Sequence, residues 1–343
     1  MDGLKRELIS EASRRGLPNV IVFTTGGTIA SSAQSATAMS GYQPSVGARG
    51  LVESVPELRD VANIWGVELC NILSKDMTSA MALRASQAIA AELAYPDVAG
   101  AVLTHGTDTL EETAFLLDAT IASSKPVVLV GSMRPASALS ADGPMNIFQA
   151  VSVAACTAAR GRGTMIVTND RIGSAWYTEK HHANSVDSFY SAEQGQLGVF
   201  LEHRPVFFYG PAVPTGKVVL DVTACTALPQ VDVLFGHQDA NTALITAAAA
   251  SGARGLVFCN VGNGSWNAEA KAVAKKLYDE TDIPIVFSRR PEIGYALQLQ
   301  GDDWAIPSGC LSPQKARILL QLCLQAGKTF AETKSVFLRT MGL

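Results

Sequence analysis

Two hydroxyl-rich turns have the residue types that nucleophilic chemistry needs. The first is TTGGTIAS, Thr24–Ser31, and the second is THGTDTLEET, Thr104–Thr113. Each follows an apolar run typical of a buried strand. A hydroxyl group attacks a carbonyl carbon once a neighbouring group takes its proton or lowers its proton affinity. Helix capping alone explains many such clusters when they are taken singly, but two clusters at the ends of neighbouring strands favour a functional site.

Other kinds of site are disfavoured by residue spacing. The first turn has no lysine where a phosphate-binding GxxxxGK[ST] loop needs one, and VGNGSW, Val261–Trp266, lacks the third glycine of the dinucleotide-binding pattern. The six cysteines and five histidines show no metal-ligand spacing, and only His181 and His182 are adjacent. We therefore expect neither a metal nor a cofactor.

The composition is that of a globular chain with a large core. The 343 residues are 48% hydrophobic and 17% charged, with a net charge of −4 and no basic run. Nucleic-acid binding needs clustered Lys and Arg, so it is not expected. The polar N-terminus lacks the apolar region of a secretory signal, and no apolar segment is long enough to span a bilayer. With cysteines expected to be reduced thiols, these features predict a cytoplasmic protein without a membrane partner.

The elements that must position both turns are buried strands that alternate with Ala-rich helices. This alternation predicts an α/β fold, with a larger N-terminal domain built on a doubly wound, mostly parallel sheet and a smaller C-terminal α/β domain. In such sheets, ligands bind at the carboxyl ends of the strands, where both turns lie. The expected strands are Asn19–Thr25, Val98–His105, Pro126–Ser132, Thr164–Asp170, Val231–His237, Gly255–Val261 and Ile283–Arg289. The expected helices include Met81–Ala94, Thr109–Ser123, Asn146–Ala159 and Ala268–Glu280.

The stretch between the two strand series is punctuated by Pro205, Pro211, Pro214 and Gly216. Such a composition is typical of a linker, because proline and glycine interrupt regular elements. We therefore predict an N-terminal domain at residues 1–205 that carries the candidate threonines, a linker at 206–228 and a C-terminal domain at 229–343.

The two turns together resemble the paired signatures of the bacterial-type L-asparaginase/glutaminase-asparaginase family. The resemblance continues through KPVVLVGSMRPASALSADGPMNIFQA (Lys125–Ala150), NVGNGS (Asn260–Ser265) and SGCLSPQKARILLQL (Ser308–Leu322), and so covers the chain from about Leu17 onward. It implies a cofactor-independent amidohydrolase that releases ammonia from the side-chain amide of L-asparagine or a close analogue. It also implies a homotetramer built from two intimate dimers.

The resemblance implies a role for each of five catalytic candidates. Thr28 matches the nucleophile, and Tyr42 matches its activating partner on a Gly/Ser/Ala-rich segment that forms a lid in this family. Thr107, Asp108 and Lys180 match a second constellation, in which the lysine lowers the proton affinity of the threonine and the aspartate fixes the ammonium or holds a substrate amine. Which threonine attacks first stays open; we favour Thr28 for the acyl-enzyme and Thr107 with Lys180 for activating the water of the second step.

Substrate binding is implied for a further set of residues. Ser74, helped by backbone N–H groups near two glycines, matches the contact to the substrate carboxylate, which a neutral cradle of donors suits. A second serine contributes a backbone contact to the substrate amide, and Asn263, or Ser265 just after it, matches a residue that the family presents from a neighbouring subunit. A structural role is favoured for Arg134. The binding residues other than Ser74 are Gly27, Lys75, Gly106, Ser132, Asn263 and Ser265.

Lys75 departs from the family pattern, because asparagine-hydrolysing members commonly carry glutamine there to help hold the substrate α-amino group. A cation would repel that ammonium, and the segment after Pro291 supplies no clearly matching partner-subunit glutamate. One hypothesis is therefore an amidase for an asparagine-like substrate without a free α-amine, such as an N-substituted asparagine or succinamate. The alternative is that Lys75 points to solvent and Asp108 alone holds the amine.

Two further function classes remain in view. A non-catalytic small-ligand-binding homologue would keep the fold but would not need both hydroxyl constellations. A nucleotide-binding α/β enzyme is disfavoured by the absent phosphate motifs. The preference between asparagine and glutamine is left open by the sequence.

Overall fold

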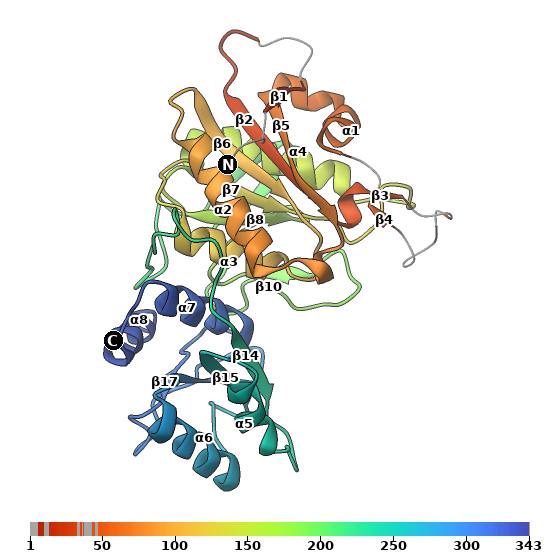
Figure 1. Cartoon of the computed structure of the whole chain (residues 1–343). Coiled ribbons are helices and arrows are strands. Elements are labelled where there is room, and N and C mark those ends of the chain that lie inside the picture. The colour runs from red at the N-terminus through yellow and green to blue at the C-terminus, as the bar shows by residue number, and fades with distance from the viewer. Residues whose placement is uncertain are drawn as a thin grey trace. The chain divides into compact units, whose positions relative to one another are not determined.

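The computed structural model describes residues 6–9, 14–32, 35, 37, 43–44 and 47–342. The chain divides into two compact units, Met1–Val213 and Pro214–Leu343. Both are α/β, as predicted (Figure 1). The boundary between the units falls within the predicted linker, residues 206–228. That this whole stretch is a linker remains a prediction.

The first unit is built on one sheet of nine strands, in which five adjacent central strands, β5, β2, β6, β7 and β8, are parallel and the outer pairings are antiparallel. In spatial order the strands are β1 (Glu7–Leu8), β5 (Asn63–Ile72), β2 (Asn19–Gly26), β6 (Val98–Thr104), β7 (Val127–Val130), β8 (Thr164–Thr168), β9 (Arg171–Ser174), β12 (Gly198–Leu201) and β13 (Arg204–Phe207). The carboxyl ends of β2 and β6, which carry the two turns, are therefore neighbours.

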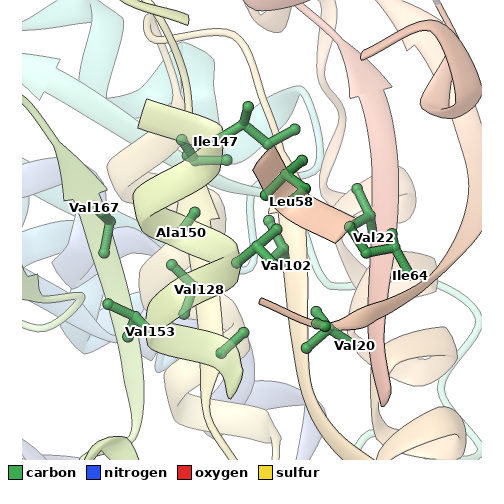
Figure 2. Packing of buried hydrophobic residues seen from close by; sticks show 14 of the residues in the cluster. Val20, Val22, Leu58, Ile64, Val102, Val128, Ile147, Ala150, Val153 and Val167 are labelled. Carbon is green, nitrogen blue, oxygen red and sulfur yellow. The ribbon is translucent and has the colours of Figure 1, made fainter. Parts of the chain in front are cut away.

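Helices cover both faces of this sheet, which explains the unbroken apolar runs of its strands. Val20 and Val22 of β2 share a core with Ile147 and Val153 of α4 (Gly143–Ala155) (Figure 2). Alternate residues of the same strand are also fully buried, on the face of α2 (Ser79–Leu93) and α3 (Leu110–Thr120), which pack against each other. Each buried valine or isoleucine contributes about 1.5–3 kcal/mol, so this double burial fixes the strand ends firmly.

Short elements complete the first unit. They are η1 (Thr28–Ala30), β3 (Ser31–Ser32), β4 (Gln43–Pro44), α1 (Ala48–Glu53), η2 (Pro56–Asp60), η3 (Ser74–Asp76), η4 (Thr157–Ala159), β10 (Glu179–Lys180) and β11 (Phe189–Tyr190). Strand β5 and hairpin β10–β11 have no counterpart among the predicted elements. Helix α4 begins three residues before its predicted start of Asn146, because Pro144 is tolerated in the first helical turn.

The second unit has a parallel sheet of four strands, β14 (Val231–Phe235), β15 (Gly255–Asn260), β16 (Ile285–Arg289) and β17 (Ile306–Pro307). Its helices are α5 (Ala243–Ala250), α6 (Ala268–Thr281), α7 (Pro313–Gln325) and α8 (Phe330–Arg339). Phe258, Phe287 and Trp304 are part of its core. No helix in the described part of the chain combines the length and the apolar composition that crossing a bilayer requires.

Candidate active site

The two predicted turns touch each other at the carboxyl edge of the sheet. Strands β2 and β6 pair in register up to Thr24 opposite Thr104, and the Thr25 hydroxyl donates to the Thr104 carbonyl at 2.9 Å. Beyond them, Gly27 has a φ of 82°, and a Cβ placed there would lie 2.4 Å from the Gly106 nitrogen. Only glycine allows this approach, so it is the backbones of the two turns that meet.

Thr28 begins the short helix η1 directly after this contact and is buried. Its turn is held from both sides, because the Gly27 N–H donates to the Ile72 carbonyl at 2.8 Å and the Ser31 hydroxyl donates to the Gly27 carbonyl at 2.8 Å. The position of the Thr28 backbone is thus set by β5 and by its own turn.

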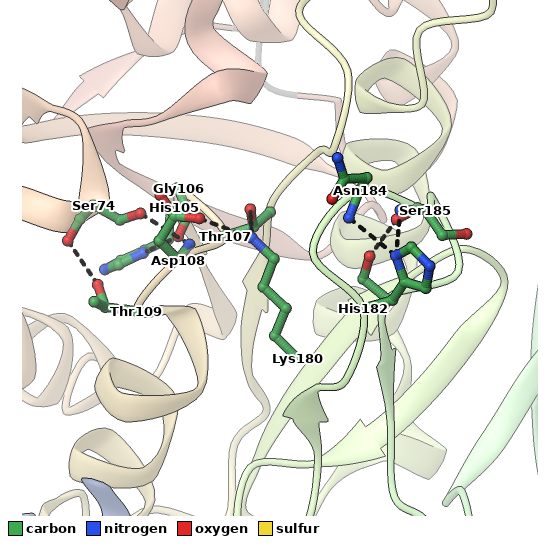
Figure 3. A network of polar contacts seen from close by, with 11 residues as sticks. Ser74, His105, Gly106, Thr107, Asp108, Thr109, Lys180, His182, Asn184 and Ser185 are labelled. Carbon is green, nitrogen blue, oxygen red and sulfur yellow. Dashed lines mark hydrogen bonds and ion pairs between the residues drawn. The ribbon is translucent and has the colours of Figure 1, made fainter. Parts of the chain in front are cut away.

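Thr107 is part of a chain of polar contacts with an ammonium and a carboxylate. Lys180 Nζ donates to Thr107 Oγ1 at 2.9 Å and lies 2.8 Å from Asp108 Oδ1 (Figure 3). The Lys180 side chain is only 13% exposed, whereas that of Asp108 is 63% exposed. An ammonium in this position stabilises negative charge on the threonine oxygen, and the exposed carboxylate keeps a free edge for a ligand cation.

The hairpin β10–β11 brings Lys180 to this place. Lys180 pairs with Phe189, which is buried. The next residue, His181, stacks on Tyr190 with ring centroids 4.1 Å apart, and its N–H donates to the Ser188 carbonyl at 2.8 Å. The hairpin is therefore held by packing as well as by its short ladder.

Ser74, in η3, is buried against the second turn. Its hydroxyl accepts from the Asp108 N–H at 3.1 Å, and its carbonyl accepts from the Thr109 hydroxyl at 2.8 Å. A Cβ on Gly106 would lie 2.6 Å from Ser74 Oγ, so the serine hydroxyl lies directly beside that glycine. Ser74, Gly106 and Asp108 form one contiguous group.

His105 was not among the candidates, although it lies in the middle of the second turn. It is fully buried, with Nδ1 2.7 Å from the Gly106 carbonyl and Nε2 2.9 Å from the Thr113 hydroxyl. A carbonyl only accepts, so Nδ1 carries the proton and Nε2 accepts from Thr113. Burial disfavours the charged imidazole and lowers the pKa of His105 to about 4. This neutral ring pins the turn to α3; the sequence signal was a histidine inside the hydroxyl cluster.

Ser132 follows β7 and lies on the same edge of the sheet. It is buried, and its hydroxyl donates to the Arg134 carbonyl at 2.8 Å. Its neighbour Gly131 approaches the second turn, because a Cβ there would be 3.0 Å from Thr107 Cγ2. The loop is held by Asp142, whose carboxylate accepts from the N–H groups of Met133 and Arg134 at 2.9 Å each.

The match to known families covers most of this chain. Residues 19–213 match the family described as "Asparaginase, N-terminal", and residues 230–337 match "Glutaminase/Asparaginase C-terminal domain". The chain belongs to the asparaginase family. This confirms the family resemblance.

Several relatives of this asparaginase-family chain align over nearly its whole length. It is 45% identical to "Probable L-asparaginase 4" of Schizosaccharomyces pombe over 97% of this chain and 93% of that protein. It is 40% identical to "L-asparaginase 2" of Bacillus subtilis over 92% of this chain and 84% of that protein. The crystal structure of a probable cytoplasmic L-asparaginase from Campylobacter jejuni superposes with a TM-score of 0.90, at 36% identity over 94% of this chain and 99% of that one.

The location of the protein stays a prediction. One relative, from Haemophilus influenzae and 37% identical over 93% of this chain and 92% of that protein, is named "Probable L-asparaginase periplasmic". Relatives named for either compartment therefore resemble this asparaginase-family chain.

Lys75, the departure from the family pattern, is an exposed residue of η3. Its ammonium lies 3.1 Å from both carboxylate oxygens of Asp76, and its side chain is 62% exposed. An exposed pair of this kind is worth at most about 1 kcal/mol, and the carboxylate offsets the charge of the lysine locally. Lys75 therefore gives little reason to exclude a substrate ammonium from this family site.

The remaining candidates lie elsewhere in the chain. Asn263 and Ser265 are together in the second unit, on the loop after β15, where the Ser265 hydroxyl donates to Asn263 Oδ1 at 3.0 Å. Tyr42 lies outside the described residues. Within the described ranges, no group of His, Cys, Asp and Glu side chains is arranged to hold a metal ion.

Proposed function

We propose that this chain hydrolyses the side-chain amide of L-asparagine to L-aspartate and ammonia. The observation that carries the proposal is the contact of Lys180 Nζ with both Thr107 Oγ1 and Asp108 Oδ1, next to the turn of Thr28. The names of relatives at 40–48% identity over most of the chain support the same substrate.

In the proposed first step, Thr28 Oγ forms a bond to the amide carbon of the substrate. The hydroxyl proton of Thr28 passes to the leaving nitrogen, with Tyr42 as its partner, and the C–N bond breaks to release ammonia. The product is an ester between the acyl group and Thr28. The tight Gly26–Gly27 turn supports this role, because it brings backbone N–H groups and a buried hydroxyl to the same edge.

In the proposed second step, water cleaves this ester and Thr28 regains its proton. In a concerted relay, Thr107 Oγ1 accepts the proton of the attacking water while its own hydroxyl proton passes to the leaving Thr28 oxygen, and the Lys180 ammonium stabilises the partial negative charge that develops during this transfer. Asp108 holds the lysine in place through their ion pair. The site therefore contains two hydroxyl constellations because Thr28 acts in the first step and Thr107 in the second.

The proposed substrate contacts follow from charge. Ser74 and the N–H groups near Gly27 and Gly106 surround the substrate α-carboxylate with donors, and the exposed edge of the Asp108 carboxylate pairs with the α-ammonium. The Ser132 backbone contacts the amide.

The proposed assembly is a homotetramer of two intimate dimers. In it, Asn263 and Ser265 complete the site of a neighbouring subunit. We also propose that the enzyme is cytoplasmic.

Ammonia release from L-asparagine, by wild type and by Thr28→Ala and Lys180→Met, tests this function. Each variant removes a group that acts on the reacting atoms, so we expect kcat to fall by about 10²–10⁴. Lys75→Met is the matched control for loss of a lysine, with an expected kcat within about twofold because that ammonium is solvated.

Two outcomes would redirect the proposal. Wild type that binds L-asparagine but releases no ammonia from any small amide would favour the non-catalytic homologue. A clear preference for succinamate or an N-acyl asparagine over L-asparagine would favour the amine-free substrate class.

A further inference from the structure

One imidazole closes the first half of the loop that joins β10 to β11, residues 181–188. His182 Nδ1 accepts from the N–H of Asn184 at 3.0 Å and from the N–H of Ser185 at 2.9 Å (Figure 3). His182 is exposed, so it is not there to fill a core. Its ring is a hydrogen-bond acceptor at the start of a turn, two residues after Lys180.

The atom that matters in this arrangement is Nδ1. A ring nitrogen that accepts two backbone N–H groups carries no proton, so the ring is neutral with its hydrogen on Nε2. Nδ1 is as many bonds from Cα as the Oδ1 of asparagine, the residue that commonly accepts from N–H groups shortly after it in turns. His182 therefore accepts the same kind of backbone hydrogen bond that an asparagine accepts in a turn.

The conformation of this loop affects the position of Lys180. Strand β10 has two residues and pairs only with the two residues of β11, so few ladder bonds hold the lysine. Within the loop, the Asp187 N–H donates to Ser185 Oγ at 3.1 Å, and the Ser188 hydroxyl donates to the Ser185 carbonyl. Asp187, near the end of the loop, is tied to the rest of the unit by an ion pair with Arg171 and by the Asn169 amide, which donates to Asp187 Oδ1 at 3.0 Å. His182 holds Ser185 and so closes the segment that directly follows Lys180.

The proposed reaction requires Lys180 Nζ to be placed accurately. Its Nζ must lie within hydrogen-bond reach of Thr107 Oγ1 and Asp108 Oδ1 together, as it does at 2.9 and 2.8 Å. A misplacement of about 1 Å at a reacting group can cost roughly 100-fold in rate. A loosened turn two residues away changes that position, whereas it leaves the Ser74 and Gly27 region intact.

We propose that His182 is a positioning residue for Lys180, acting through its Nδ1 as the acceptor that closes the first half of the loop. The inference rests on the proposed function in one respect, namely that Lys180 acts on Thr107 during turnover.

Three substitutions at this one exposed position test the proposal. His182→Asn keeps an acceptor at the Nδ1 position, His182→Gln moves it one bond further out, and His182→Ala removes it. We expect kcat for L-asparagine to fall about 10- to 100-fold in His182→Ala and His182→Gln, with KM within about threefold of wild type. His182→Asn is expected to stay within about threefold of wild type in both constants.

His203→Ala, at an exposed histidine next to β13 in the same unit, is the matched control and should leave both constants unchanged. Thermal unfolding of every variant checks that the fold persists. The proposal is overturned if His182→Ala keeps wild-type kcat, if His182→Asn loses as much as His182→Ala, or if the loss is in KM alone. Inactive wild type would instead overturn the proposed function, so the two failures are distinguishable.

Discussion

At the scale of single residues, the site places opposite charges so that each has a partner before substrate arrives. The Lys180 ammonium lies between a neutral hydroxyl and the Asp108 carboxylate, with only the carboxylate well exposed. A substrate ammonium at the exposed edge of the Asp108 carboxylate would share the carboxylate charge with Lys180, which contacts Oδ1. Binding would then weaken the ion pair and leave the lysine freer to stabilise charge at Thr107.

Asp108→Asn tests this double role. We expect kcat/KM for L-asparagine to fall at least about 100-fold, because losing the carboxylate costs both the lysine contact and the α-ammonium contact. For succinamate, which has no α-amine, only the lysine contact is lost, so the fall should be smaller. Steady-state kinetics with both substrates measures the difference; an equal fall would mean that Asp108 acts through Lys180 alone.

The buried His105 makes the free energy of unfolding depend on pH. Its pKa is lowered from 6.5 to about 4 in the folded chain by burial, so between these values the unfolded chain binds more protons. The stability contributed by the neutral ring is complete above about pH 6.5 and is lost as the pH falls towards 4. At about 1.4 kcal/mol for each pH unit between the two pKa values, the loss is on the order of 3 kcal/mol.

Urea unfolding of wild type and His105→Gln between pH 7.5 and pH 4.5 measures this contribution. We expect the wild-type free energy of unfolding to fall more steeply with acid than that of the variant, because glutamine does not titrate. Parallel pH profiles for the two proteins would contradict the burial of a neutral imidazole at this turn.

At the scale of elements, the site depends on how closely two strand ends approach. Gly27 and Gly106 meet where β2 and β6 end, and η3 places Ser74 against Gly106. Because these are backbone contacts, neither turn can shift without the other.

Gly27→Ala therefore has a clear expected outcome. A Cβ there would overlap Gly106 backbone atoms at 2.4–2.5 Å and would also strain a φ of 82°. We expect a loss of more than about 3 kcal/mol of unfolding free energy and at least 100-fold in activity. Gly195→Ala is the control, since Gly195 also has a positive φ of 76° but nothing within 4 Å of an added Cβ.

Thermal and urea unfolding of the two glycine variants separate strain from overlap. The control should lose only about 1–2 kcal/mol and keep its activity. Equal losses in the two variants would show that backbone strain alone, not the contact between the turns, governs the stability at Gly27.

At the scale of the whole molecule, the proposed site needs residues from two copies of the chain. Thr28 and Lys180 belong to the first unit, whereas Asn263 and Ser265 belong to the second. In a closed symmetric assembly, each copy would receive from its neighbour what it gives to it. Under this proposal, the activity is a property of the oligomer.

Mixing two inactive variants tests the shared site. Thr28→Ala and Asn263→Ala subunits, unfolded together and refolded at equal amounts, should recover about a quarter of the wild-type activity, because a mixed pair contains one intact site. Each variant refolded alone provides the control. Recovery no greater than the sum of the two separate variants would place Asn263 outside the neighbouring site.

The sequence by itself determined the α/β class, the two hydroxyl turns and the family. Runs such as Asn19–Thr25 are apolar at every position because both faces of the strand are covered, and this pattern is local. Strand β5 was missed because polar and charged residues interrupt its apolar pattern, which leaves a weaker signal than that of a strand buried throughout.

The tertiary structure decided which candidates meet. Lys180 and Thr107 are 73 residues apart, and Ser74 and Asp108 are 34 apart, yet both pairs are in hydrogen-bond contact. No local pattern encodes such a pair, because it depends on the order of strands in the sheet and on the packing of a hairpin whose strands have two residues each. The roles of His105 and Lys75 also depend on tertiary packing. His105 is buried and anchors the second turn, whereas Lys75 is exposed and its charge is solvated. Residue types and spacing identify the chemistry, and packing between distant segments selects the atoms that can perform it.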